Sequence, residues 1–187
     1  TIDHLFTRLA ERGTGAYGLS DVTQLDHALQ SAALAQQQGL SDAMIIAALF
    51  HDVGHLVYDQ DVHLAEDGID DKHEESSANA LLPLFGEAVS EPVRLHVASK
   101  RYLCSTEDDY YARLAEDSRI SLEVQGGLMD DQELSEFRQN PHYQMGVELR
   151  RIDDQAKVPQ LDVPPIETYR EMAERLATKA TSTAGSV

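Results

Sequence analysis

The sequence predicts an all-α protein built as one domain. Apolar residues recur at the spacing of helix faces through most of the chain, and no stretch shows the sustained apolar and polar alternation of a strand. The length of 187 residues suits one domain with a sizeable core and is short for two. We therefore expect one domain over residues 1–179 with one active site, followed by a disordered tail over residues 180–187.

The helices of the first half are predicted from apolar periodicity and from end signals. Gly13 and Gly39 end the first two helices, Ser20 or Asp21 caps the second, and Ser41 caps the third. The run from residue 44 to residue 50 is apolar all round, so it is expected to be buried on every side. In chain order, the helices expected over the whole sequence cover residues 2–12, 20–38, 42–50, 73–85, 87–102, 108–122, 131–138, 141–156 and 166–179.

Loops and prolines divide the chain after the third helix. Residues 59–72 hold six acidic side chains and a glycine, and we interpret them as a surface loop. Pro92 is expected to restart the helix in which it lies, whereas Pro141 fits the first turn of a long helix. The proline-rich residues 158–165 are expected to be an extended connector to the last helix.

The composition excludes several classes of partner. With 33 acidic and 15 basic side chains the formal charge is -18, so the average field repels nucleic acid. No window approaches the roughly 18 to 20 consecutive apolar residues of a membrane span, and the first residues do not resemble a signal peptide. The single cysteine, Cys104, cannot form an internal disulfide, which agrees with a reducing compartment. We expect a soluble, cytoplasmic protein with no nucleic-acid or membrane partner; the sequence predicts no oligomeric state.

A histidine and an aspartate directly follow the buried apolar run. Burying a charge such as that of Asp52 without a partner costs several kcal/mol, so a cation is expected beside it. Adjacent helical side chains diverge by about 100°, which suits a His51-Asp52 pair shared by metal ions better than a simple ion pair. In the alternative interpretation His51 caps the helix and Asp52 binds a backbone amide.

Four further ligand-type residues lie on other predicted helices: His27, His73, His96 and Asp153. Imidazole with carboxylate suits iron, manganese, zinc or nickel rather than calcium or magnesium. A lone histidine on any one helix would more often be structural. The set as a whole therefore indicates a metal centre.

This set resembles the metal signature of the HD-domain superfamily, a histidine, a His-Asp pair and a distal aspartate on separate helices. Most of the superfamily are phosphohydrolases with one metal ion, whereas His73 and His96 mark the branch with two. A more specific similarity is to the phosphonate-cleaving oxygenases of that branch, which are related to myo-inositol oxygenase. It extends from Tyr17 to about Lys157 and is carried by residues 17, 24–27, 51–55, 96, 100, 118–120 and 150–154.

The resemblance implies an HD-domain helical bundle around a dinuclear site with two iron ions as a mixed-valence Fe(II)/Fe(III) pair. One iron would be held by His27, His51, Asp52 and Asp153, and the other by His73 and His96, with Asp52 bridging. Molecular oxygen would be the co-substrate, and a small hydroxyphosphonate would lose its phosphorus by oxidative cleavage of the C–P bond. The implied catalytic residues are Tyr17, His55 and Lys100, and the implied substrate contacts are Ser20, Asp21, His55, Lys100, Ser118 and Arg150.

Helical spacing agrees with several of these roles. His55 and Lys100 lie four residues after His51 and His96, so each can point into the same pocket as its neighbour. Arg150, one turn before the distal aspartate, can do so from another wall, where its guanidinium suits a phosphonate. The structural alternatives are a helix cap for His55, a solvated lysine, a surface ion pair for the arginine and an N-cap for Ser118.

The identity of residue 20, a serine, helps to distinguish between candidate substrates. In the aminoethylphosphonate enzyme of this family a glutamate at the matching position pairs with the primary ammonium, which serine cannot do, although Asp21 could. A trimethylammonium prefers aromatic faces, so the serine favours (R)-1-hydroxy-2-(trimethylammonio)ethylphosphonate, cleaved to glycine betaine and phosphate. Alternatives are the primary-amine analogue giving glycine, an HD-type metal-dependent phosphohydrolase, and a non-catalytic sensor domain. The tyrosines available for an aromatic pocket are Tyr17, Tyr58, Tyr102, Tyr110 and Tyr111.

Overall fold

The computed structural model describes residues 1–187 except 16, 18–20, 58–71 and 185–187, and its regular structure is helical throughout those described residues. The prediction of an all-α protein is confirmed. In chain order the helices are α1 (Ile2–Arg12), α2 (Gln24–Gln37), α3 (Asp42–Phe50), α4 (Gly54–Val57), α5 (His73–Phe85), α6 (Glu87–Thr106), α7 (Tyr110–Arg113), α8 (Glu116–Val124), α9 (Asp131–Gln139), α10 (Tyr143–Gln155), the 3-10 turn η1 (Ile166–Tyr169) and α11 (Arg170–Ala184).

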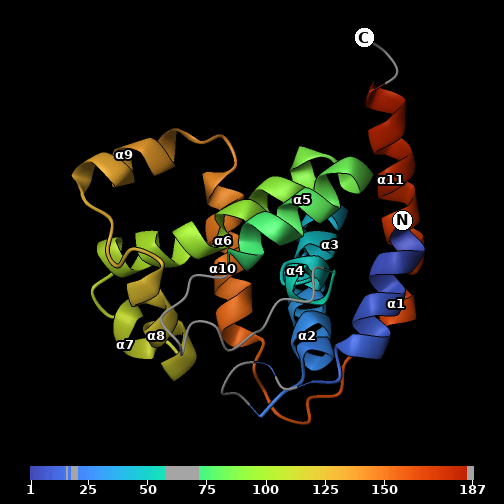
Figure 1. Ribbon diagram of the computed structural model, residues 1–187, viewed down its shortest axis with the longest axis horizontal. Coiled ribbons are helices and arrows are strands. Elements are labelled where there is room, and N and C mark those ends of the chain that lie inside the picture. The colour runs from blue at the N-terminus through green and yellow to red at the C-terminus, as the bar shows by residue number, and fades with distance from the viewer. Residues whose placement is uncertain (16, 18–20, 58–71, 185–187) are drawn as a thin grey trace.

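Helix α3 lies at the centre of a bundle. It packs against α2, α6, α10 and α11, while α1 and α11 lie at one end of the molecule and α7 to α9 at the other (Figure 1). Ile46, Ala47, Ala48 and Phe50 are fully buried, so the prediction that this helix is enclosed on every side is confirmed. None of the described helices combines the length and the apolar character needed to cross a bilayer.

The N-terminus of α2 differs from the prediction. The cap is Thr23, whose hydroxyl accepts from the amide of Asp26 while the Asp26 carboxylate accepts from the amide of Thr23. This capping box satisfies two amides at once, which a cap at Asp21 would not do. Asp21 is exposed before the helix, and Ser20 lies outside the described residues.

Three other helix boundaries also differ, for reasons of packing. Helix α6 continues through Pro92 without a restart and extends to Thr106, because Leu103 is buried. The helix expected over 108–122 divides into α7 and α8, because Leu114 leaves helical geometry to pack with Leu103 and Tyr110. Helix α11 continues to Ala184, over part of the segment expected to be a tail, and residues 185–187 lie outside the described residues.

Gly146 lets α10 approach α6 closely. A Cβ atom there would lie 2.7 Å from the Cβ of Leu95 and 3.0 Å from the Oγ of Ser99. We expect Gly146→Val to lower the free energy of unfolding by about 1 to 3 kcal/mol, because the added methyl groups force the two helices apart. Urea denaturation measures the change. Gly127→Ala is the control for backbone strain, because Gly127 has a positive φ and open space around it, so its substitution causes strain without crowding. Unchanged stability of Gly146→Val would contradict this account.

Candidate metal centre

The C-terminal end of α3 places His51 and Asp52 in the middle of the bundle. His51 is the C-cap of the helix, and its Nδ1 lies 2.9 Å from the carbonyl oxygen of Ala48. Because a carbonyl can only accept, Nδ1 carries the proton and the Nε2 lone pair faces away from the helix. Gly54 then lets the chain turn tightly against α5, since a Cβ there would lie 2.8 Å from the carbonyl oxygen of His73.

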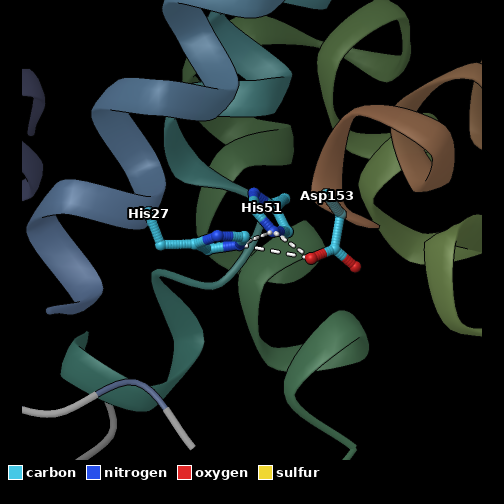
Figure 2. A group of neighbouring side chains, drawn as sticks. All are labelled: His27, His51 and Asp153. Carbon is cyan, nitrogen blue, oxygen red and sulfur yellow. Dashed lines mark hydrogen bonds and ion pairs between the residues drawn. The ribbon is translucent and has the colours of Figure 1, made fainter. Parts of the chain in front are cut away.

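His27, His51 and Asp153 form a first ligand group. They come from α2, from the end of α3 and from α10, and their polar ends point toward one another (Figure 2). The Nε2 atom of His27 lies 3.1 Å from Nε2 of His51 and 3.2 Å from Oδ1 of Asp153. All three side chains are almost fully buried.

The hydrogen bonds of this group direct its remaining ligand atoms toward a point that a cation could occupy. The Nδ1 of His27 lies 2.8 Å from the carbonyl oxygen of Ala156 and must donate to it, as His51 does to Ala48. With both imidazoles neutral, as metal ligands must be, two Nε2 lone pairs face each other, and Oδ1 of Asp153 is buried without a hydrogen-bond partner in the described residues. Such an arrangement is repulsive alone and favourable around a metal ion.

Asp52, His73 and His96 form a second ligand group. Oδ1 of Asp52 lies 3.5 Å from Nε2 of His73 and 3.6 Å from Nε2 of His96, and those two nitrogens are 3.2 Å apart. His96 also donates through Nδ1, to the carbonyl oxygen of Val93 at 2.6 Å, so its Nε2 is free to ligate. Oδ1 of Asp52 is buried and accepts no hydrogen bond within the described part of the chain.

Asp52 joins the two groups. Its other oxygen, Oδ2, lies 3.3 Å from Nε2 of His51 and 3.8 Å from Nε2 of His27. Within each group the ligand atoms lie within 4.8 Å of one another, so each group could hold one metal ion with Asp52 between them. Imidazole and carboxylate donors of this kind suit iron, manganese or zinc.

The charges of the two groups are strongly coupled. Burial alone would raise the pKa of Asp52, but the imidazoles of His51, His73 and His96 hold it well below its ordinary value. Burial would lower the pKa of His51, yet the two neighbouring carboxylates raise it to about 10, so a metal ion would have to displace a proton from its Nε2. Burial together with His73 lowers the pKa of His96 to about 3. The carboxylates are thus ionised, and His96 is neutral as a metal ligand must be.

Tyr17 closes one side of the centre. Its hydroxyl donates to Oδ2 of Asp52 at 2.7 Å, and its ring stacks on His27 with centroids 4.0 Å apart. Burial and the charge of Asp52 raise the pKa of the phenol well above its usual value, so it remains protonated. The structure therefore places Tyr17, which the resemblance implied as a catalytic residue, beside the candidate ligands.

A cavity of about 100 Å³ adjoins the centre. It contains the predicted substrate contacts His55, Lys100, Ser118 and Arg150, whereas Asp21 is not among its lining residues. His55 is buried and stacks on His73 with centroids 4.7 Å apart. Of the tyrosines proposed for an aromatic pocket, only Tyr17 lines the described part of the cavity, and Tyr58 lies outside the described residues. The others lie elsewhere: Tyr102 packs on Phe137, Tyr110 binds Asp154, and Tyr111 is exposed.

Arg150 is held by a buried network as well as lining the cavity. It donates through Nη1 to Oδ2 of Asp153 at 2.7 Å, through Nε to Tyr110 at 3.2 Å, and through Nη2 to Ser118 and Asp154. One Nη1 N–H is left for a ligand. The contact with Oδ2 leaves the other oxygen of Asp153 directed at the histidines, so Arg150 also orients a candidate metal ligand.

Sequence reasoning missed four polar residues that line the cavity: Asp117, Ser121, Gln125 and Lys157. Three of these lie on or at the end of α8 at spacings of four, which places them on one face with Ser118. Lys157 follows α10 four residues after Asp153. The spacing was visible in the sequence, but nothing in it identified the inward face of α8.

Comparison with known proteins identifies the relationship of the chain. No family model matches it. It is 46% identical over 177 residues to hydroxymethylphosphonate dioxygenase of Gimesia maris, covering 92% of this chain and 86% of that protein. The chain belongs to the phosphonate dioxygenase family. It is also 37% identical over 168 residues to the glycine-betaine-forming [1-hydroxy-2-(trimethylamino)ethyl]phosphonate dioxygenase of Leisingera caerulea, covering 90% of this chain and 86% of that one.

Lys100 is expected to make anion binding in this cavity depend on pH. Burial and the charge of Arg150 lower the pKa of its ammonium to about 7, against the opposing charges of Asp153 and Asp154, and its Nζ donates to Ser121 at 2.6 Å. We expect anion binding to weaken as the pH rises through 7, because the neutral amine loses its charge. Binding of inorganic phosphate across pH 6 to 9 measures the effect. Lys100→Arg should shift the loss to higher pH, and an unchanged profile in that variant would contradict the assignment.

Proposed function

We propose that this protein is a two-iron dioxygenase that cleaves the C–P bond of a small 1-hydroxyphosphonate. The observation that carries the proposal is the pair of ligand groups joined by Asp52, set beside a cavity lined by Lys100 and Arg150. In a protein of net charge -18, the charges of Lys100 and Arg150 offset the repulsion that a phosphonate dianion would otherwise meet on entering the cavity. Family membership supplies the reaction type.

The ligand groups fit two iron ions. His27, His51 and Asp153 would hold one ion and His73 and His96 the other, with Asp52 between them. Bound as a mixed-valence Fe(II)/Fe(III) pair, the metals would supply oxygen activation and oxidation at the hydroxyl-bearing carbon. The buried surroundings keep bulk water away from these ligands.

The protein's own side chains would position the substrate. Lys100 and the remaining N–H of Arg150 would bind phosphonate oxygens, with the Ser118 hydroxyl beside them. Tyr17 holds Oδ2 of Asp52 through its hydroxyl and would yield that side of the centre to the substrate. His55, buried in the cavity wall, lies where it can hydrogen-bond a substrate oxygen and pass on the hydroxyl proton.

We propose hydroxymethylphosphonate as the preferred substrate. Its oxidation by one O₂ balances to formate, phosphate and one proton. The cavity has room for several water molecules and suits a ligand of few atoms, and its described lining offers three cations and a single tyrosine. Greater identity to the hydroxymethylphosphonate relative agrees with this choice.

The trimethylammonio substrate expected from the sequence is the second candidate. The 37% identical relative, named as forming glycine betaine, favours it. Ser20 is compatible with either substrate, because a compound without an amine needs no glutamate there.

Oxygen consumption and phosphate release decide between these functions. We expect the iron-loaded protein to release one phosphate per O₂ from hydroxymethylphosphonate, with a higher kcat/KM than for the trimethylammonio compound. The reverse preference would establish the second candidate. Phosphate release from nucleotides or phosphate esters under argon, with no turnover of either phosphonate, would instead indicate a phosphohydrolase and overturn the proposal.

A further inference from the structure

Lys157 is a cavity-lining cation that donates no hydrogen bond to the part of the chain that the structure describes. Its side chain is 12% exposed, and its Nζ lies 4.0 Å from Oδ1 of Asp153 and 4.0 Å from Oδ1 of Asp117. The ammonium also lies over the ring of Tyr17, 5.4 Å from the ring centroid. These contacts are longer than hydrogen bonds, and none of the described residues accepts a hydrogen bond from its Nζ.

The other two cations of the cavity are engaged. Lys100 donates to Ser121 at 2.6 Å, and Arg150 donates to Asp153, Asp154, Tyr110 and Ser118. An entering anion can therefore gain more from Lys157, whose three N–H groups have no acceptor in the described part of the chain. Hydrogen bonds from an ammonium to an ionised oxygen are stronger than the long contacts that Lys157 makes now.

Lys157 also lies beside a carboxylate that could otherwise bind a positive group. Among the described residues that line the cavity, Asp117 is the carboxylate that belongs to neither ligand group. Its Oδ1 accepts from the amide of Ser118 at 2.7 Å, and Lys157 is the side-chain cation beside it. A substrate with a positive substituent could be received by Asp117 only in competition with Lys157, and it would be repelled by that ammonium.

We infer that Lys157 is the residue that determines the charge of the accepted substrate: it binds the anionic group and excludes substrates that carry an ammonium. The inference deepens the proposed function and rests on it. Two effects combine in one side chain, since the same ammonium attracts phosphonate oxygens and neutralises Asp117. Removing the charge of Lys157 should weaken the binding of hydroxymethylphosphonate and favour substrates that carry an ammonium.

Three variants test this role. Lys157→Gln removes the charge but keeps a polar side chain of similar reach, and Lys157→Arg keeps the charge. Arg175→Gln removes an exposed positive charge on α11, outside the cavity, and is the matched control. Circular dichroism and melting temperature establish that each variant is folded before binding or turnover is compared.

The first measurement is binding without turnover. Under argon, calorimetry of the iron-loaded protein with hydroxymethylphosphonate and with inorganic phosphate should give a Kd about tenfold to a hundredfold higher for Lys157→Gln, the range expected for a lost charged hydrogen bond. Lys157→Arg should remain within about threefold of the wild type, as should Arg175→Gln. An unchanged Kd in Lys157→Gln would overturn the inference.

The second measurement is specificity in air. In Lys157→Gln the KM for hydroxymethylphosphonate should rise with a smaller change in kcat, and the ratio of kcat/KM should move by at least about tenfold toward the trimethylammonio compound and its primary-amine analogue. A fall in kcat/KM by the same factor for all three substrates would refute the selection by charge. If the wild type cleaved none of them, the proposed function would fail, while the anaerobic Kd values would still decide whether Lys157 binds the anion.

Discussion

Replacing Asp52 by alanine is expected to empty both metal positions and to lower activity by well over a hundredfold. Oδ1 of Asp52 faces His73 and His96, and Oδ2 faces His51, so no other residue of the described chain contacts both ligand groups in this way. Losing a residue that merely orients a ligand already costs about 10 to 100-fold in metal affinity or activity. Metal analysis and oxygen consumption measure both effects.

The same substitution should lower stability in a way that depends on metal. At a free metal concentration of 100 times Kd, each bound ion stabilises the folded state by about 2.7 kcal/mol. Wild-type protein should therefore melt at a lower temperature after chelation, whereas Asp52→Ala should be insensitive to the chelator. His96→Ala, which removes a ligand of one group, should lose mainly one ion. A full complement of iron in Asp52→Ala would show that Asp52 does not join the two positions.

Arg150→Met is expected to lower the free energy of unfolding by about 3 to 5 kcal/mol, the cost of removing one partner of a buried ion pair. Arg150 is 4% exposed and Asp153 is 2% exposed, so the carboxylate would be left buried with one cation fewer. Burial raises the pKa of Asp153, and Arg150 and Lys157 hold it well below its ordinary value. The stabilisation is thus present above the unfolded-state pKa of about 3.9 and is lost as the pH falls through the folded-state value.

Arg151→Met is the matched control for that experiment. Arg151 is the next residue of α10 and is exposed, where it pairs with Glu107. An exposed ion pair contributes about 0 to 1 kcal/mol, so this variant should unfold at nearly the wild-type denaturant concentration. Chemical denaturation at pH 7 compares the two. Equal stabilities would mean that the Arg150 network contributes no more than a surface contact.

The sequence was sufficient to predict most helices and the residues of the centre. Helix faces repeat locally, and glycine and serine signals at helix ends act within a few residues. The ligand types at His27, His51-Asp52 and Asp153 follow a spaced motif, and the structure brings these side chains together. Helix boundaries at Leu114 and Leu103 could not be predicted, because they depend on packing between segments distant in the chain.

The cavity was less predictable than the ligands. Arg150 was expected to bind substrate, but most of its donors are used by Tyr110, Ser118, Asp153 and Asp154, and two of these come from other helices. An aromatic pocket of several tyrosines was possible from composition, but the described lining contains one. Lys157 lies just beyond a helix, where periodicity carries no information on direction.

The imidazole of His27 hydrogen-bonds the carbonyl of Ala156, 129 residues further along the chain. During synthesis on the ribosome this contact must wait until α10 has left the exit tunnel. Asp52, His73 and His96 lie closer together in the chain and can meet while the C-terminal helices are still being made. The two proposed metal positions should therefore mature in sequence, and a nascent chain stalled before α10 should bind metal only at the position that contains His96.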